Sequence, residues 1–355
     1  MRYVIAGIPI EIPGTLLAGH FAKALTPFAS TELTPPESAA NVDASADPAA
    51  ATSGPAAGSA AAAVAALVAA SAGDSDRSNP GPHGNDRRSD PAESYSKIPA
   101  DCSGPELLLR PGICPPPLPG YRELDSFDFA DADADCRFGL DPEGYLLEMA
   151  PRSGSAPARF RKEFLSPVVT TDFTLAHNPA LLRFGLWTAF NLAAIRRQCI
   201  AFHSSVISYR KRGILFLGES GTGKSTHTRL WREHISGAAL LNDDSPIIRI
   251  CDGRAWVCGS PWSGKTPCYR NIEQPVAAIV RLSQAPHNLI RRLPPLEALG
   301  ALLPSCPPAF ARDERLQDLV CDIVSELIRQ VPVFHLECLP DADAAQLACK
   351  TIFEA

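Results

Sequence analysis

A glycine-rich segment in the second half of the chain has the residue types and spacing that phosphate chemistry requires. The apolar run 214–217 leads directly into the motif Gly218-x-x-x-x-Gly223-Lys224-Ser225, and a helix-capable segment follows. Glycines let successive backbone N–H groups turn toward phosphate oxygens, where a side chain would block the approach. The lysine of such a loop reaches the β and γ phosphates, and the serine hydroxyl binds Mg2+. The segment therefore predicts a P-loop that binds ATP with Mg2+.

The start of the following helix adds its positive end to the same site, which favours a bound anion. The residues predicted to bind the nucleotide form one continuous stretch: Gly218, Glu219, Ser220, Gly221, Thr222, Gly223, Lys224, Ser225 and Thr226.

Two adjacent acidic residues, Asp243 and Asp244, follow the next apolar run, residues 238–242. Carboxylates at the end of an apolar strand suit Mg2+, either directly or through water. Only one helix fits between the glycine loop and these acids, so we expect the P-loop helix itself to join the two strands. The sequence therefore predicts that the acids lie beside the phosphates.

Three further residues are candidates for the same chemistry. His203 belongs to the predicted strand 200–209, Lys265 to a second glycine-containing loop, and Arg270 follows that loop. A histidine can contact an acid pair or a phosphoryl group, and cations can stabilise transition-state charge. A strand histidine with satisfied hydrogen bonds and a solvated turn lysine remain open alternatives.

Composition excludes several classes of function. The 355 residues carry a formal net charge of −6, and a pI near 5.8 argues against a surface that binds nucleic acid. The 11 cysteines contain no CxxC pair, which is typical of reduced thiols in a cytoplasmic protein.

The apolar N-terminus, residues 1–13, is interrupted by two prolines and a glutamate, so we expect a strand there rather than a signal peptide. No segment reads as a membrane span, since the Ala-rich run 60–70 is too short.

The chain divides into three predicted parts. Residues 1–28 and 101–164 form a small β-rich domain, which includes an acidic stretch (125–135) predicted as a solvated strand face or loop and a hairpin over 136–149. Residues 29–100 are rich in Ala, Ser, Pro and Gly, which predicts a disordered insertion. Residues 165–355 form an α/β domain around the P-loop. In it we expect a packed helix over 178–197, a hairpin over 249–258, a strand over 276–282, helices over 297–303, 316–329 and 343–353, and a strand over 333–336.

The motif His203-Ser-Ser, the glycine loop and Asn242-Asp-Asp, in this order and at close spacing, resemble HPr kinase/phosphorylase. They also resemble its structural relatives, the ATP-dependent phosphoenolpyruvate carboxykinases. The resemblance covers about residues 165–355 and implies a P-loop domain of that α/β type with a mixed sheet. The closest resemblance is to bacterial HPr-kinase-like serine kinases.

The resemblance also implies roles for single residues. The glycines and Lys224 match the phosphate cradle, and Ser225 matches a magnesium ligand. Asp243 matches a general base that takes the proton of the substrate hydroxyl, and Asp244 matches a carboxylate associated with the metal. His203 matches a histidine of the same site, and Arg270 matches an arginine that stabilises transition-state charge.

The implied activity is phosphoryl transfer from Mg-ATP to a hydroxyl, namely a serine of a protein or peptide, HPr-like proteins included. Thr226 stands where HPr kinases carry glutamate, which favours an acceptor other than HPr itself. Two alternatives remain: an enzyme like phosphoenolpyruvate carboxykinase, which needs arginines such as Arg249 or Arg270 beside the acids, and a non-catalytic nucleotide-binding switch. The oligomeric state, a homo-oligomer included, is left open.

Overall fold

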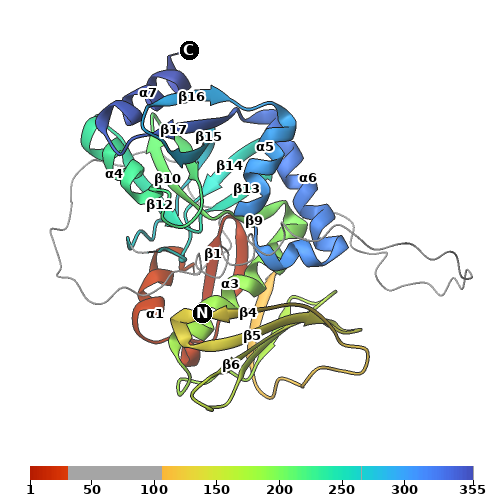
Figure 1. Cartoon of the computed structure of the whole chain (residues 1–355). Coiled ribbons are helices and arrows are strands. Elements are labelled where there is room, and N and C mark those ends of the chain that lie inside the picture. Colours follow the sequence, from red (N-terminus) through yellow and green to blue (C-terminus); the bar gives the residue numbers. More distant parts are fainter. Residues whose placement is uncertain (31–105, 265, 355) are drawn as a thin grey trace, which may run out of the picture.

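The computed structural model describes residues 1–30, 106–264 and 266–354 (Figure 1). In these ranges the chain is mixed α/β, and its two sheets each combine parallel and antiparallel pairs of strands. All but the first two residues of the predicted insertion 29–100 lie outside the described residues, and so does Lys265. No helix in the described ranges is both long enough and apolar enough to cross a membrane.

The first sheet has the strand order β1-β2-β3-β8-β7-β6-β5-β4. Its strands are β1 (Arg2–Ile5), β2 (Ile8–Glu11), β3 (Leu107–Pro111), β4 (Arg122–Phe129), β5 (Ala134–Leu140), β6 (Gly144–Pro151), β7 (Ala158–Glu163) and β8 (Val168–Thr171). The hairpin predicted over 136–149 is confirmed as β5 and β6.

One prediction for this half of the chain needs correction. The N-terminus forms a hairpin rather than one strand, because Ala6 and Gly7 take φ values of 52° and 77° and turn the chain back between β1 and β2. A short helix, α1 (Gly19–Leu25), follows this hairpin. At the other end of this half, β8 pairs with β7 and β3, so the first sheet includes residues 168–171.

The second sheet has the order β12-β10-β11-β15-β14-β13-β9, with β17 beside β15 and β16 beside β17. Its strands are β9 (Cys199–Ala201), β10 (Ser204–Tyr209), β11 (Arg212–Leu217), β12 (Ala239–Asp244), β13 (Ile247–Cys251), β14 (Arg254–Cys258), β15 (Glu273–Gln284), β16 (Leu289–Arg292) and β17 (Val333–Cys338). The strand predicted over 200–209 is interrupted at Phe202 and His203, and its two halves pair with different neighbours.

Alternation along the strands explains how the helices cover both faces of this sheet. On β11, Ile214 and Phe216 belong to one apolar cluster together with residues of α4 (Lys224–His234) and α7 (Ala342–Phe353). Leu215 and Leu217 belong to a second cluster with residues of α3 (Pro179–Ala194), α5 (Pro295–Leu302) and α6 (Glu314–Gln330). The predicted helices are thus confirmed, with ends that differ by a few residues.

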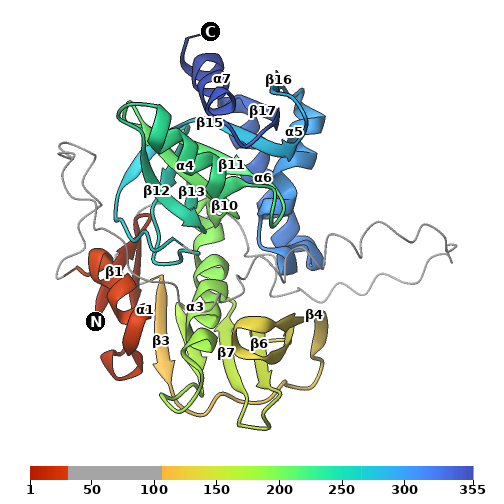
Figure 2. The same ribbon diagram turned by 60° about the vertical axis from the view of Figure 1, so that its left-hand side comes forward.

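Helix α3 lies between the two sheets and contacts both β7 and β9 (Figure 2). It begins where expected, because Pro179 takes the first helical position and the Asn178 side chain accepts a hydrogen bond from the Ala180 N–H at 3.0 Å. At Gly185 an added Cβ would lie 2.3 Å from the Phe160 ring of β7. Glycine at this position therefore allows the close approach of α3 to the first sheet.

Candidate functional site

The glycine loop connects the carboxyl end of β11 to the first turn of α4, as the sequence predicted. Gly218 and Gly223 have φ values of 151° and 102°, in the region that favours glycine. A Cβ on Gly218 would also lie 2.5 Å from Thr222 Oγ1. The Thr222 hydroxyl donates to the Glu219 carbonyl at 2.8 Å, which fixes the curvature of the loop.

Lys224, the first residue of α4, lies across this loop. Its Nζ donates to the carbonyl oxygens of Gly218 at 2.7 Å and Glu219 at 3.2 Å. Burial lowers the pKa of Lys224, and the nearby carboxylates of Asp244 and Asp243 act in the opposite direction. The ammonium group is thus partly desolvated and close to both acids, where a phosphate group would stabilise its charge.

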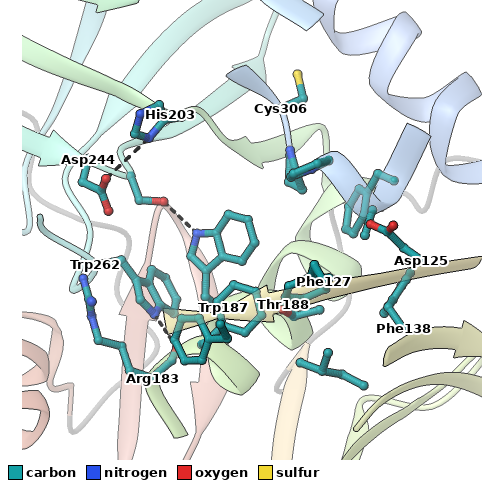
Figure 3. Close-up of a pocket in the computed structure, with 18 of the residues that line it drawn as sticks. Asp125, Phe127, Phe138, Arg183, Trp187, Thr188, His203, Asp244, Trp262 and Cys306 are labelled. Atoms are coloured by element: carbon teal, nitrogen blue, oxygen red, sulfur yellow. Dashed lines mark hydrogen bonds and ion pairs between the residues drawn. The ribbon is translucent and has the colours of Figure 1, made fainter. Parts of the chain in front are cut away.

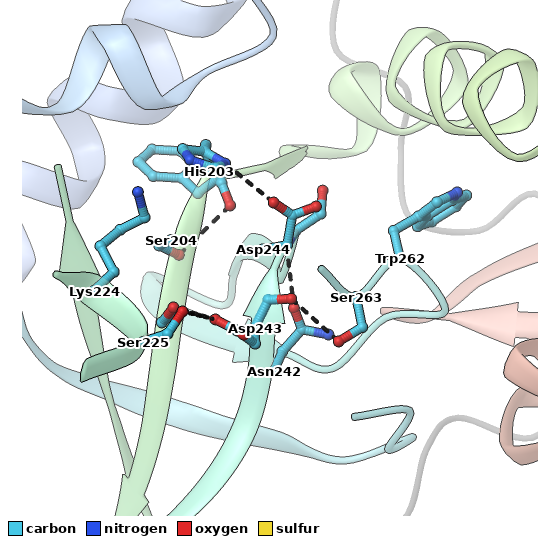
Figure 4. Close-up of polar contacts among 12 residues, drawn as sticks. His203, Ser204, Lys224, Ser225, Asn242, Asp243, Asp244, Trp262 and Ser263 are labelled. Atoms are coloured by element: carbon cyan, nitrogen blue, oxygen red, sulfur yellow. Dashed lines mark hydrogen bonds and ion pairs between the residues drawn. The ribbon is translucent and has the colours of Figure 1, made fainter. Parts of the chain in front are cut away.

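The two acids end β12, which pairs with β10 at the edge of the sheet. Asp243 is 5% exposed, and its Oδ1 accepts a hydrogen bond from the Ser205 hydroxyl of β10. The hydroxyl of Ser225, on α4, lies 3.5 Å from the same oxygen (Figure 4). The structure therefore brings the predicted magnesium ligand Ser225 into contact with Asp243.

Asp244 faces a different set of groups. Its backbone has a φ of 116°, which is rare for a residue other than glycine, and an isolated β-bridge to Ser263 holds it there. The neighbouring Gly264 N–H donates to the Asp243 carbonyl at 2.6 Å. His203 Nδ1 lies 3.4 Å from Asp244 Oδ1, while His203 Nε2 is buried with no hydrogen-bond partner in the part of the chain that the structure describes.

The oxygen atoms that could bind a metal ion at this position are of the kind that Mg2+ prefers. The described residues contain no group of three or more His, Cys, Asp or Glu side chains that could hold a metal by themselves. A hydroxyl from Ser225 and a carboxylate oxygen from Asp243 are hard ligands, and Mg2+ in nucleotide sites takes its remaining ligands from phosphate and water. The site can therefore hold the cation together with a nucleotide.

Three hollows follow one another around these residues. The first, of about 530 Å³, lies beside the loop and is lined by Gly221, Gly223, Thr226 and apolar side chains of β15, α4 and the segment after β17. The second, of about 280 Å³, shares those three residues and also contains Lys224, Ser225, His203 and both acids. The third is a narrower cavity with aromatic walls, and it shares His203 and Asp244 with the second (Figure 3).

Arg270 is the predicted site residue that the structure does not bring to the acids. Its side chain is exposed and lies beside the Cys268 thiol, and it lines none of the three hollows. The Glu219 side chain is also exposed, so this residue contributes its backbone to the loop.

Sequence reasoning overlooked three residues at the site. Ser205 is part of the motif His203-Ser-Ser, but only the register of β10 against β12 shows that it faces Asp243. Trp262 lies in the second glycine-containing loop. Arg183 belongs to α3, and its guanidinium donates to the Ser263 carbonyl at 2.5 Å. No local pattern in the sequence indicates that α3 reaches this site.

No protein-family model matches the chain, and no curated protein matches it. Among solved structures, the chain is similar to the Hpr(Ser) kinase/phosphatase from Coxiella burnetii, with 14% sequence identity and a TM-score of 0.25. The match covers 43% of this chain and 93% of that chain.

Proposed function

We propose that this protein is a kinase that transfers the terminal phosphoryl group of Mg-ATP to a hydroxyl group. One observation carries the proposal: the P-loop residues Lys224 and Ser225 share a single hollow with the acid pair Asp243 and Asp244. A cation for the phosphates, a ligand for the metal and a proton acceptor are the groups that phosphoryl transfer requires from a protein.

The order of the hollows along the loop indicates how a bound nucleotide would be oriented. The wide hollow, with its apolar wall of Leu230, Leu282 and Leu339, suits the nucleoside. The phosphates then follow the glycine loop, and the terminal phosphate reaches the hollow that contains the acids. In this arrangement the Lys224 ammonium group gives up its hydrogen bonds to the carbonyls of Gly218 and Glu219 and donates to phosphate oxygens instead. Bound Mg2+ would neutralise the charge that develops on the phosphates.

We further propose that the two acids have different roles, one in binding the metal and one in accepting the proton. Asp243 contacts the Ser225 hydroxyl, which supports a role on the metal side. Asp244 contacts His203 and lines the aromatic cavity on the side away from the phosphates, which supports a role as the acceptor of the hydroxyl proton. This assignment reverses the one implied by the sequence resemblance, in which Asp243 was the base. Comparing variants of each acid separates the two roles.

The resemblance named a serine of a protein or peptide as the acceptor, whereas the contacts themselves require only a hydroxyl. The carboxykinase alternative has less support, because Arg249 is paired with Glu273 at 2.6 Å and Arg270 is exposed. The non-catalytic switch predicts tight nucleotide binding without turnover, so the experiment below separates it from the kinase.

The test measures binding and consumption of Mg-ATP by the wild type and by Lys224→Ala, with Lys350→Ala as the matched control. Lys350 is an exposed lysine in the last turn of α7. We expect ATP consumption in the wild type and the control and its loss in Lys224→Ala. Tight binding with no transfer to water or to any acceptor would favour the switch, and equal turnover in all three proteins would contradict the proposal.

A further inference from the structure

The cavity with aromatic walls lies between the first sheet, α3 and the end of β12 (Figure 3). Seven Phe and Trp rings line it: Phe127, Phe129, Phe138, Phe184, Trp187, Trp262 and Phe310. Because His203 and Asp244 belong both to this cavity and to the hollow around the P-loop, a molecule in the cavity would contact the proposed proton acceptor.

The polar atoms of the aromatic wall are satisfied within the protein. Trp187 Nε1 donates to Ser245 Oγ at 2.7 Å, and Trp262 Nε1 donates to the Arg183 carbonyl at 3.1 Å. The Phe184 ring stacks on Phe129 with a centroid distance of 4.8 Å. The walls therefore offer an occupant apolar ring surfaces, and burying apolar groups there is the main source of affinity.

Charge at the cavity selects against anions. Among the residues that line it, the carboxylates of Asp125, Asp131 and Asp244 outnumber the guanidinium of Arg183. Asp131 Oδ1 is also buried with no hydrogen-bond partner among the described residues. An additional carboxylate on a ligand would meet like charges in a partly desolvated site. The sequence had predicted a solvated acidic segment here, whereas Asp125 and Asp131 are partly buried.

Size limits the occupant further. The cavity volume is about 90 Å³. A cavity of roughly 150 Å³ holds benzene. A nucleotide is therefore excluded, and a molecule of a few carbon atoms fits. A serine on a folded protein would bring only one methylene group to the aromatic walls and would leave most of the apolar surface without a partner.

Building on the proposed function, we propose that the phosphoryl acceptor is a small, non-anionic alcohol with an apolar body that binds in this cavity. Its apolar body lies against Phe184 and Trp187, and its hydroxyl points toward Asp244 and His203. The hydroxyl oxygen forms a bond to the terminal phosphorus of ATP, and the bond from that phosphorus to the bridging oxygen breaks. The hydroxyl proton passes to the Asp244 carboxylate, and the products are a phosphate monoester and ADP.

The first arm of the test compares acceptors. The wild type is incubated with Mg-ATP labelled in the terminal phosphate and with propan-1-ol, ethylene glycol or glycolate, and with HPr as a protein acceptor. We expect label on propan-1-ol, and at least about tenfold lower kcat/KM for ethylene glycol, which has the same number of heavy atoms but lacks the apolar body. We expect a similar reduction for glycolate, which carries the disfavoured carboxylate.

The second arm fills the cavity. Ala309 lies in the short helix η7 (Pro308–Arg312) and lines the cavity, whereas Ala311 of the same helix is exposed and does not line it. Ala309→Leu should reduce kcat/KM for propan-1-ol by about tenfold or more, and Ala311→Leu should leave it unchanged. Ala180→Leu fills the cavity from α3 and should act like Ala309→Leu. The affinity of each of the three variants for Mg-ATP, measured in parallel, should equal that of the wild type. This measurement also shows that the variants fold.

The outcomes separate this inference from the proposed function. Transfer to HPr that is insensitive to Ala309→Leu, with no transfer to propan-1-ol, would overturn the inference and leave the kinase standing. Equal use of all three small acceptors would also overturn it. If the wild type neither consumes ATP nor labels any acceptor, the proposed function fails, and the inference fails with it.

Discussion

At the scale of single residues, Lys224 determines how the site responds to pH. Burial lowers the pKa of its ammonium group, so this lysine loses its proton at a lower pH than an exposed lysine. A bound triphosphate favours the charged form and raises the pKa again. At an alkaline pH below the ordinary lysine pKa of 10.5, binding of ATP should therefore be accompanied by uptake of a proton from the buffer.

Isothermal titration calorimetry in two buffers with different ionisation enthalpies measures this proton uptake. In Lys224→Arg the uptake should disappear, because a guanidinium stays protonated at this pH. The same proton uptake in both proteins would show that Lys224 is not the group that titrates.

The position of the glycine loop between a strand and a helix was the part of the site that the sequence predicted best. The glycines, Lys224 and Ser225 are close together in sequence, and their spacing alone reports a shared loop. Arg183 could not be found in this way, because it reaches Ser263 through the position of a whole helix. The sequence also did not indicate where the Arg270 side chain lies. In the structure it is exposed and lies beside Cys268.

At the scale of elements, α4 contains a buried histidine that links its stability to pH. His227 is 3% exposed, accepts a hydrogen bond from Trp231 Nε1 at 3.1 Å, and has a pKa lowered by burial to about 4 from 6.5. As the pH falls below 6.5 the unfolded chain binds a proton that the folded chain does not. The free energy of unfolding should therefore decrease between pH 6.5 and 4, by about 3 kcal/mol in total.

Thermal unfolding across this pH range tests the effect. His227→Gln keeps an acceptor for Trp231 but does not titrate, so its melting temperature should fall less steeply than that of the wild type. Parallel curves for the two proteins would show that carboxylates elsewhere account for the whole pH dependence.

Helix α3 gives a second prediction at this scale, with an internal control. Gly185→Ala would place a Cβ 2.3 Å from the buried Phe160 ring and should destabilise the protein by about 1–3 kcal/mol. Gly300→Ala, in the exposed interior of α5, meets nothing within 4 Å and should stabilise it by up to about 1 kcal/mol. Urea denaturation measures both changes, and the same sign in both variants would contradict the packing of α3 on β7.

Element types were largely predictable because apolar periodicity is a local property. The exceptions are points where tertiary pairing decides. No local pattern indicates that the run 200–209 is interrupted at Phe202. Before the interruption β9 pairs with β13, and after it β10 pairs with β12. That interruption is what places His203 opposite Asp244.

At the scale of the whole molecule, the two sheets share one apolar core. A single cluster contains Phe160 of β7, Leu186 of α3 and Ile248 of β13. The Tyr145 hydroxyl of β6 also donates to Asp313, whose carboxylate caps the start of α6. The division at residues 164 and 165 was predicted from composition, and it remains a prediction about folding units.

We expect the two sheets to unfold together in urea, since a shared core couples them. The four tryptophans lie in α3, in α4, in β14 and in the loop after β14, so their fluorescence reports on the second sheet and on the helix between the sheets. Hydrogen exchange of β6 and β7, followed by mass spectrometry, reports on the first. One common midpoint is the expected result, and two separate midpoints would support independent domains.

In the proposed reaction, Asp244 accepts the proton of the acceptor hydroxyl, beside a P-loop that holds Mg-ATP. The most direct measurement compares transfer of labelled phosphate to the acceptor hydroxyl in the wild type, Asp244→Asn and Asp243→Asn, together with the affinity of each protein for Mg-ATP. Asp244→Asn should reduce turnover by about 10²–10⁴-fold with little change in affinity. Asp243→Asn should weaken the dependence on Mg2+ and lower the affinity for Mg-ATP. Wild-type turnover in Asp244→Asn would contradict the account.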